Sequence, residues 1–257
     1  MSEYIDVGPR DGLPVVFVHA FPLSHAMWQA QVDALKESYR VVAYDVRGFG
    51  ASGAGDGQYT LEFLVDDLIA LLDQLKIEKF VVCGESMGGY IALRTVERRP
   101  NRFCGLVLCD TRSEADSDEA KLKRAAALKT IKTEGVAAFG EQFVKSVLSP
   151  VTLSSRPDVV ERIKKLIAVN KPVGLCGALL AMASRTDTTA NLKNIAVPTL
   201  VLVGEHDPLT PPEVAYKLRE HIPDAAVYTV PSAGHLSNME NPHEFNQRLA
   251  EFLSGLS

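Results

Sequence analysis

The sequence predicts an α/β protein with a mostly parallel sheet flanked by helices. One observation predicts this class, and a second predicts a helical segment inserted into it. Short apolar segments typical of buried strands alternate with helical segments from about residue 4 to the C-terminus. Between residues 110 and 198 the alternation stops, and about four helical patterns follow one another, far more chain than a crossover connection needs.

The expected strands are apolar runs bounded by turn residues. They lie near Ile5 and over residues 14–20, 40–46, 79–84, 104–110, 198–204 and 225–231. Among the helices, the one from Thr60 has the clearest periodicity, because its apolar residues recur at i, i+3, i+4 and i+7 while acidic residues take the other side. Its apolar positions are Leu61, Leu64, Val65, Leu68, Leu71, Leu72 and Leu75. We expect this helix to cover one face of the sheet.

The run of helical patterns divides the chain into a core domain, residues 1–112 and 186–257, and a helical cap, residues 113–185. The cap helices are expected over residues 117–132, 135–148, 157–170 and 172–184. The last two begin with prolines, which suit the first turn of a helix. Apolar stripes along such helices are typical of packed core, so only a few of their side chains would line a substrate pocket.

Composition argues against several classes of function. The 257 residues are 46% hydrophobic and 23% charged, as in a globular protein, and the net charge of −5 offers no basic surface for nucleic acid. No apolar run approaches the roughly 20 residues that span a bilayer, and the N-terminus lacks a basic and then apolar signal. We therefore expect a cytoplasmic protein that binds neither nucleic acid nor membrane.

Residue spacing also argues against metal and cofactor sites. The four cysteines, at positions 83, 104, 109 and 176, lie in apolar surroundings without Cys-x-x-Cys spacing and are expected to be core thiols. The histidines lack a zinc-binding pattern such as His-Glu-x-x-His. Residues 48–53 match the dinucleotide fingerprint Gly-x-Gly-x-x-Gly, but the next helix begins only near Thr60, so we interpret them as a structural loop. We expect no cofactor.

The most informative motif is Gly-Glu-Ser-Met-Gly-Gly at residues 84–89, between an expected strand and an expected helix. Glycines at 84 and 88 suit a sharp turn, because they tolerate crowded backbone angles and let strand and helix approach closely around a protruding serine. Ser86 is therefore the candidate nucleophile. A serine hydroxyl is a poor nucleophile at neutral pH and needs a base, which a third group holds in place.

Asp207 and His235 are the candidates for these two roles. Each stands in a turn directly after an expected strand, downstream of the serine. Asp110, which ends its own strand, is the alternative acid. Asp45 and Arg47 could form a substrate-binding pair, but we interpret them as residues that brace a loop.

The tetrahedral intermediate of acyl transfer carries an oxyanion that needs preplaced donors. These would be the backbone N–H of Met87, directly after the serine, and that of Phe21, in the loop after an earlier strand. Pro22 biases Phe21 away from helix, and we expect the Phe21 side chain at the mouth of the pocket. His19 is interpreted as a brace for this loop and not as a proton-transfer residue.

Five segments together resemble the α/β-hydrolase family: residues 19–22, 45–52, 84–89, 204–207 and 234–235. The order serine, aspartate, histidine is the one expected of that family. Within it the chain resembles small carboxylesterases and 3-oxoadipate enol-lactonases. Ala20, where the family usually has glycine, and Glu85, where relatives often carry histidine, depart from the pattern. The resemblance implies the α/β-hydrolase fold with a helical cap inserted after the sixth strand.

The resemblance also implies a serine hydrolase that cleaves small carboxylic esters through an acyl-enzyme. Ser86 would attack, His235 would take the proton and return it to the leaving alcohol, and Asp207 would hold the imidazole. Hydrolysis of lactones such as enol-lactones is the alternative, and a ligand receptor derived from a hydrolase is a further one. Serine in the elbow argues against haloalkane dehalogenases, which use aspartate there.

Overall fold

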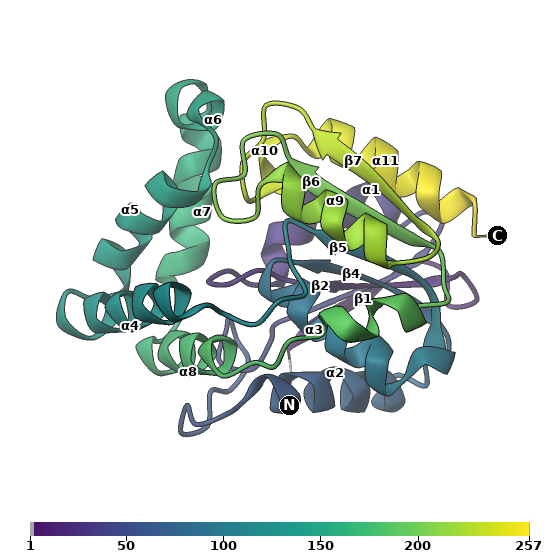
Figure 1. The fold of residues 1–257 in the computed structure, drawn as a ribbon, viewed down its shortest axis with the longest axis horizontal. Coiled ribbons are helices and arrows are strands. Elements are labelled where there is room, and N and C mark those ends of the chain that lie inside the picture. Colours follow the sequence, from purple (N-terminus) through teal and green to yellow (C-terminus); the bar gives the residue numbers. More distant parts are fainter. Residues whose placement is uncertain (1–2, 257) are drawn as a thin grey trace.

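The computed structural model describes residues 3–256, and within them seven strands form one sheet (Figure 1). The strands are β1 Tyr4–Val7, β2 Pro14–Val18, β3 Arg40–Tyr44, β4 Phe80–Glu85, β5 Phe103–Cys109, β6 Thr199–Gly204 and β7 Ala225–Val230. Their order across the sheet is β1-β3-β2-β4-β5-β6-β7. Only β1 runs antiparallel to its neighbour among these strands. The prediction of a mostly parallel sheet is confirmed.

The central strands are valine-rich because a parallel sheet covered on both faces buries every side chain of its inner strands. Val15 and Val16 of β2 lie opposite Val81 and Val82 of β4, and all four are fully buried. Several strands end one or two residues before the expected position. Those residues instead begin the loops at the carboxyl ends of the strands.

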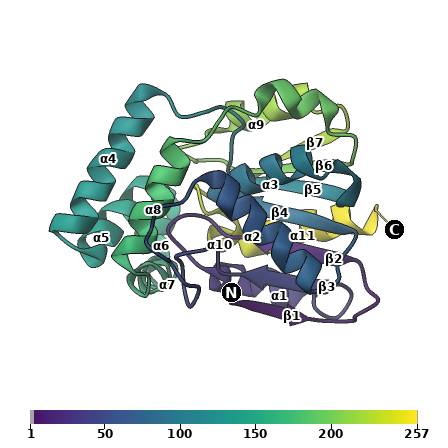
Figure 2. The ribbon, with the colours of Figure 1, turned by 90° about the horizontal axis from the view of Figure 1, so that it is seen from below.

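Helices cover both faces of this sheet. Outside the helical insertion they are α1 Gln29–Leu35, α2 Leu61–Gln74, α3 Met87–Arg98, α9 Pro212–His221, α10 Ser237–Glu240 and α11 Pro242–Ser254, with 3₁₀ turns η1 His25–Trp28, η2 Pro100–Arg102 and η3 Thr189–Asn194. In Figure 2, α2 and α3 lie in front of the sheet while α1 and α11 lie behind it. The expected helix from Thr60 is α2, and its leucine stripe is buried as predicted.

Five consecutive helices stand apart from the sheet, on the left of Figure 1. They are α4 Asp118–Thr133, α5 Val136–Val147, α6 Pro150–Ser155, α7 Pro157–Ala168 and α8 Pro172–Ala183. Four of them match the expected helices. The fifth, α6, lies between two of the expected ranges, and it forms because the Ser149 hydroxyl accepts from the Thr152 N–H at 3.1 Å while Pro150 fills the first turn.

The insertion follows β5, in agreement with the expected strand ranges and one strand earlier than the resemblance implied. The reason is that the chain before β2 supplies a single strand, the four-residue β1. The division into a core, residues 1–112 and 186–257, and a cap, residues 113–185, stays a prediction at this point. Within residues 3–256 no single helix is long and apolar enough to cross a membrane, and α7 with α8, bent by 96°, would qualify only as a pair and only by length and composition.

Candidate active site

Ser86 occupies the sharp turn between β4 and α3. Its backbone angles, φ 51° and ψ −109°, lie in a region that residues other than glycine rarely adopt. Neighbouring groups hold this conformation: the Ser86 N–H donates to the Cys109 carbonyl at 2.8 Å, and the Thr111 hydroxyl donates to the Ser86 carbonyl at 2.8 Å. The elbow is therefore tied to the adjacent strand β5, which keeps the Ser86 side chain in one place.

Glycines beside Ser86 allow a close approach of three segments. A Cβ atom on Gly84 would lie 2.4 Å from the Gly88 carbonyl oxygen, and one on Gly88 would lie 2.1 Å from the Val18 oxygen. No side chain fits in either place. The predicted need for glycine at both positions is confirmed, and the contact with Val18 brings the loop after β2 against the first turn of α3.

The structure brings Ser86, His235 and Asp207 together. The Ser86 Oγ lies 2.8 Å from His235 Nε2, and His235 Nδ1 lies 2.8 Å from Asp207 Oδ2. Asp207 follows β6 and His235 follows β7, so parallel strands deliver all three residues to one edge of the sheet. A hydroxyl, an imidazole and a carboxylate in this line can pass the hydroxyl proton to the imidazole.

The surroundings of Asp207 keep it ionised. Burial alone would raise its pKa, but the His235 imidazole and the N–H and hydroxyl of Thr210 lower the pKa to about 2. Thr210 was missed by the sequence analysis, although the spacing Asp-x-x-Thr in a turn is typical of a hydroxyl that bonds back to the carboxylate.

His235 is fully buried, which lowers its pKa, but the Asp207 carboxylate raises it by more, so the pKa lies above the usual 6.5. The Thr210 hydroxyl lies 3.3 Å from the same ring nitrogen, Nδ1. Since Nδ1 donates to the carboxylate, Nε2 of the neutral ring is free to accept the proton of Ser86. A raised pKa makes this imidazole a stronger base than free histidine.

Asp110, the alternative acid, bonds elsewhere. Its carboxylate accepts from the Gly204 N–H at 2.7 Å and from the Ser237 hydroxyl at 2.5 Å. Burial and the charge on Asp207 raise its pKa to about 7. Glu85 beside it is fully buried, and no donor from residues 3–256 reaches either of its oxygens. Burial and the neighbouring Asp110 charge raise the pKa of Glu85 well above its usual value, which favours the protonated form of this side chain.

Two backbone N–H groups near Ser86 have no partner within the described part of the chain. Met87 is the first residue of α3, where an N–H has no acceptor in its own helix. The Phe21 N–H also donates to no group of residues 3–256. The Phe21 ring lies between the core and α5, with centroids 5.9 Å from Phe139 and 6.3 Å from Phe143. The assignment of the Met87 and Phe21 N–H groups as oxyanion donors stays a prediction.

His19 braces the loop that carries Phe21, as the sequence analysis interpreted it. Its Nδ1 donates to the Ala20 carbonyl at 2.9 Å, and its Nε2 accepts from the Val46 N–H at 2.9 Å. Complete burial lowers its pKa to about 4, so the ring is neutral at pH 7. Ala20 does not have a positive φ, which explains why alanine can replace the glycine usual in the family.

Asp45 and Arg47 brace loops and do not pair with each other. Asp45 accepts from the His25 N–H at 2.8 Å and from the Ala51 N–H at 2.9 Å, while Arg47 pairs with Asp67 at 2.6 Å. The interpretation of residues 48–53 as a structural loop agrees with these contacts. Among residues 3–256, no group of three or more histidine, cysteine, aspartate or glutamate side chains is arranged to hold a metal ion.

Comparisons with known proteins agree with this geometry. The family model described as alpha/beta hydrolase fold matches residues 14–242. The 3-oxoadipate enol-lactonase 2 of Acinetobacter baylyi is 30% identical over 244 residues, which cover 95% of this chain and 90% of that protein.

Solved structures give the same result. A thermophilic esterase from Thermogutta terrifontis, bound to malate, is 38% identical with a TM-score of 0.95, over 99% of this chain and 93% of that one. An enol-lactonase from Burkholderia xenovorans is 29% identical with a TM-score of 0.92, over 98% and 96%. The predicted enzyme class, carboxylic ester hydrolase or lactonase, is the class these relatives are named for. The chain belongs to the α/β-hydrolase fold family.

Proposed function

We propose that the protein hydrolyses small carboxylic esters through an acyl-enzyme formed on Ser86. The line of hydrogen bonds from Ser86 Oγ to His235 Nε2 and from His235 Nδ1 to Asp207, each 2.8 Å long, is the observation that supports this most directly. The similarity to a named esterase, at 38% identity over nearly the whole chain, supports the same substrate class.

In the proposed reaction the Ser86 oxygen attacks the ester carbonyl carbon while His235 Nε2 takes the hydroxyl proton. The imidazolium then gives that proton to the leaving alcohol as the carbon–oxygen bond breaks. A water molecule, deprotonated by the same imidazole, cleaves the acyl-enzyme and releases the acid. Asp207 stays ionised throughout, holding the ring and stabilising its positive charge. No cofactor takes part in these steps.

The backbone N–H groups of Phe21 and Met87 are proposed to bind the oxyanion of each tetrahedral intermediate. Both lie beside the elbow, and neither donates a hydrogen bond to another group of residues 3–256, so both are free to bind an oxyanion. Removing one donor of this kind typically costs about 100-fold to 1000-fold in turnover.

We propose that residues 113–185 act as a cap over this site, with residues 1–112 and 186–257 as the core. The Phe139 and Phe143 rings of α5 pack on Phe21, so an apolar wall stands beside a proposed oxyanion donor. With this wall beside the site, we expect short or medium acyl chains to be preferred over long ones. A panel of p-nitrophenyl esters of increasing length measures this preference.

Lactone hydrolysis is the second candidate, because two of the similar proteins are named enol-lactonases. It uses the same three residues, but the alcohol and the acid stay in one molecule. Comparing kcat/KM for enol-lactones and for open-chain esters separates the candidates. A single slow turnover on both would instead favour a ligand receptor derived from a hydrolase.

The replacement Ser86→Ala tests the proposal. We expect kcat/KM for p-nitrophenyl acetate to fall by at least about 1000-fold, because the nucleophile is removed, while the melting temperature stays close to that of the wild type. Ser113→Ala is the control, since the Ser113 hydroxyl bonds to Thr189 and not to a histidine. Ester turnover that survives Ser86→Ala would show that another residue is the nucleophile.

A further inference from the structure

The direction of the Phe21 N–H depends on the carbonyl that shares its peptide plane. This is the Ala20 carbonyl, which accepts from His19 Nδ1 at 2.9 Å and from the Leu23 N–H at 2.9 Å. Because the peptide group is planar, holding the Ala20 oxygen also sets the direction of the Phe21 N–H. The other end of this short turn is the Pro22 carbonyl, and its partner comes from a distant part of the chain.

That partner is Asn170, in the connection between α7 and α8. Its Nδ2 donates to the Pro22 carbonyl at 2.7 Å, and its Oδ1 accepts from the Gly50 N–H at 2.7 Å. The same Nδ2 also lies 3.0 Å from the Leu166 carbonyl of α7. The residue is 4% exposed. One buried amide thus joins the loop after β2, the loop after β3 and the end of a helix.

We propose that Asn170 is a positioning residue for catalysis: from the helical segment, it holds the loop of residues 19–23 so that the Phe21 N–H meets the oxyanion. This inference rests on the proposed function, since it gives the Phe21 N–H a task. Asn170 itself does not touch the reacting atoms. It acts through the Pro22 carbonyl, next to the residue that carries the donor.

Asparagine suits this position because its amide donates and accepts at once. Aspartate could accept from the Gly50 N–H but has no hydrogen for the Pro22 carbonyl, and leucine could serve neither group. Losing the donor leaves a buried carbonyl without a partner, which favours movement of the loop towards water. A movement of about 1 Å near a reacting group can cost on the order of 100-fold in rate.

A second contact restrains the same residue from the same helical segment. The Phe21 ring lies in edge contact with Phe143 and tilted against Phe139, both on α5. The side chain of Phe21 is therefore held by α5 while the backbone beyond it is held by Asn170. Both restraints on the proposed donor come from residues outside the sheet, so the helical segment contributes to the geometry of the oxyanion site.

A purely structural role for Asn170 predicts a different result. The bond to the Leu166 carbonyl could simply finish α7, in which case replacement would lower stability and leave turnover per folded molecule unchanged. A positioning role predicts a loss confined to the transition state. The oxyanion forms only after attack, so kcat falls while KM, set by the unreacted ester, changes little.

The test compares Asn170→Asp and Asn170→Leu with the wild type. We expect kcat for p-nitrophenyl acetate to fall about 10-fold to 100-fold in both, with KM within about threefold of the wild type. The inhibition constant of a trifluoromethyl ketone, whose adduct with serine carries an oxyanion, should rise by a similar factor. Asn170→Asp keeps the side-chain size and the Gly50 contact, so it serves if Asn170→Leu folds poorly.

Arg162→Leu is the matched control, because Arg162 lies on α7 and also donates to a core carbonyl, that of Ala26, at 3.3 Å. It should leave kcat and the ketone affinity unchanged. Hydrogen exchange of the peptide spanning residues 19–25 gives a readout independent of activity. Exchange should be faster than in the wild type in both Asn170 variants and unchanged in Arg162→Leu. Unchanged exchange or unchanged kcat in a folded Asn170→Asp would overturn the inference, whereas a wild type without esterase activity would overturn the proposed function instead.

Discussion

Three buried carboxyl groups lie near Ser86, and their partners give them different charges. Asp207 accepts several hydrogen bonds and has a pKa lowered to about 2, while Glu85 receives none from the described residues, and burial with the Asp110 charge raises its pKa well above the usual value. Asp110 lies between these extremes, with a pKa of about 7. Proximity to the site therefore does not decide which acid serves the histidine. Direct contact does: Asp207 Oδ2 lies 2.8 Å from His235 Nδ1, whereas the Asp110 carboxylate bonds to Gly204 and Ser237.

The raised pKa of Asp110 predicts a pH dependence of stability. Its pKa rises from 3.8 to about 7 on folding, so the folded protein keeps a proton that the unfolded chain releases. The resulting stability is fully present below pH 3.8 and is lost as pH rises through about 7. Asp110→Asn has no such proton to lose. The free energy of unfolding of the variant minus that of the wild type should therefore increase from pH 4 to pH 7, by at most about 1.4 kcal/mol per pH unit.

Urea titrations at pH 5, 6 and 7 measure this difference. The lost hydrogen bonds of Asp110 shift the variant by a constant amount, so the slope against pH is the result that matters. Asp187→Asn is the control: contacts with Thr189 outweigh partial burial and lower the pKa of Asp187, so its difference from the wild type should stay flat over this range. An equally flat line for Asp110→Asn would show that Asp110 is ionised in the folded protein.

For single residues, the sequence predicted which side chains stand at strand ends better than it predicted which distant residues form hydrogen bonds with each other. The meeting of Ser86, Asp207 and His235 could be predicted because each follows a strand, and parallel strands deliver their ends to one edge. Asn170 lies 148 residues from Pro22, and no local pattern marks it. Its role depends on how two distant segments meet, which requires the tertiary structure.

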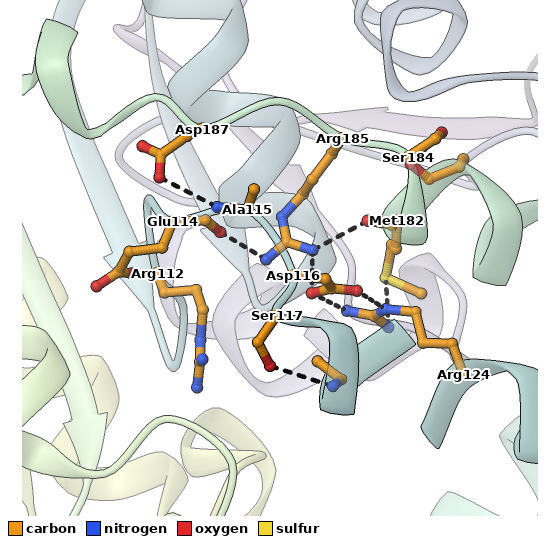
Figure 3. A network of polar contacts seen from close by, with 12 residues as sticks. Arg112, Glu114, Ala115, Asp116, Ser117, Arg124, Met182, Ser184, Arg185 and Asp187 are labelled. Atoms are coloured by element: carbon orange, nitrogen blue, oxygen red, sulfur yellow. Dashed lines mark hydrogen bonds and ion pairs between the residues drawn. The ribbon is translucent and has the colours of Figure 1, made fainter. Parts of the chain in front are cut away.

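Two connections join the helical insertion to the sheet, and a buried ion pair ties them together (Figure 3). Arg185, after α8, pairs with Asp116, before α4, and its guanidinium also donates to the Glu114 carbonyl at 2.7 Å. The Arg185 side chain is 2% exposed and lies 4.0 Å from the centroid of the Tyr90 ring on α3. Entry to and exit from the helical segment are thus held side by side against the core.

Replacement of Arg185 should therefore be costly. Arg185→Met keeps the length of the side chain but leaves Asp116 with one partner, Arg124, so we expect the free energy of unfolding to fall by roughly 3 kcal/mol. Arg124→Met should cost less, because the Arg124 side chain is 20% exposed, against 2% for Arg185. Urea titration of both variants gives the comparison. If both variants lost the same free energy of unfolding, the deeper burial of Arg185 and its contact with the Glu114 carbonyl would add no stability beyond the charge on Asp116 that both arginines neutralise.

The elements themselves were largely predictable because helices and strands follow local periodicity. The α2 stripe and the valine-rich strands appear in the structure where expected. The exceptions have physical causes: α6 is only six residues long, too short to show a period, and β1 is one short edge strand where the resemblance implied an additional strand before the insertion. Ion pairs such as Arg185 with Asp116 join residues 69 apart, which no periodicity reveals.

Across the whole molecule, the helical segment meets the core through backbone contacts at glycine. A Cβ atom on Gly174 of α8 would lie 1.9 Å from the Gly48 carbonyl oxygen, in the loop after β3. The Tyr59 hydroxyl donates to the Gly174 carbonyl at 2.8 Å and strengthens the same contact. Close docking of α8 therefore depends on the absence of one methyl group.

Gly174→Ala tests whether this docking stabilises the molecule. Alanine favours a helix by about 1 kcal/mol over glycine, so an undocked α8 would gain stability. We instead expect a net loss of about 1–3 kcal/mol, because the methyl group pushes α8 off the Gly48 loop, together with faster hydrogen exchange in α8 and unchanged exchange in β2 and β4. Gly53→Ala is the control, since no atom lies within 4 Å of its added methyl group. If Gly174→Ala proved as stable as Gly53→Ala, the close contact between α8 and the core would not exist in solution.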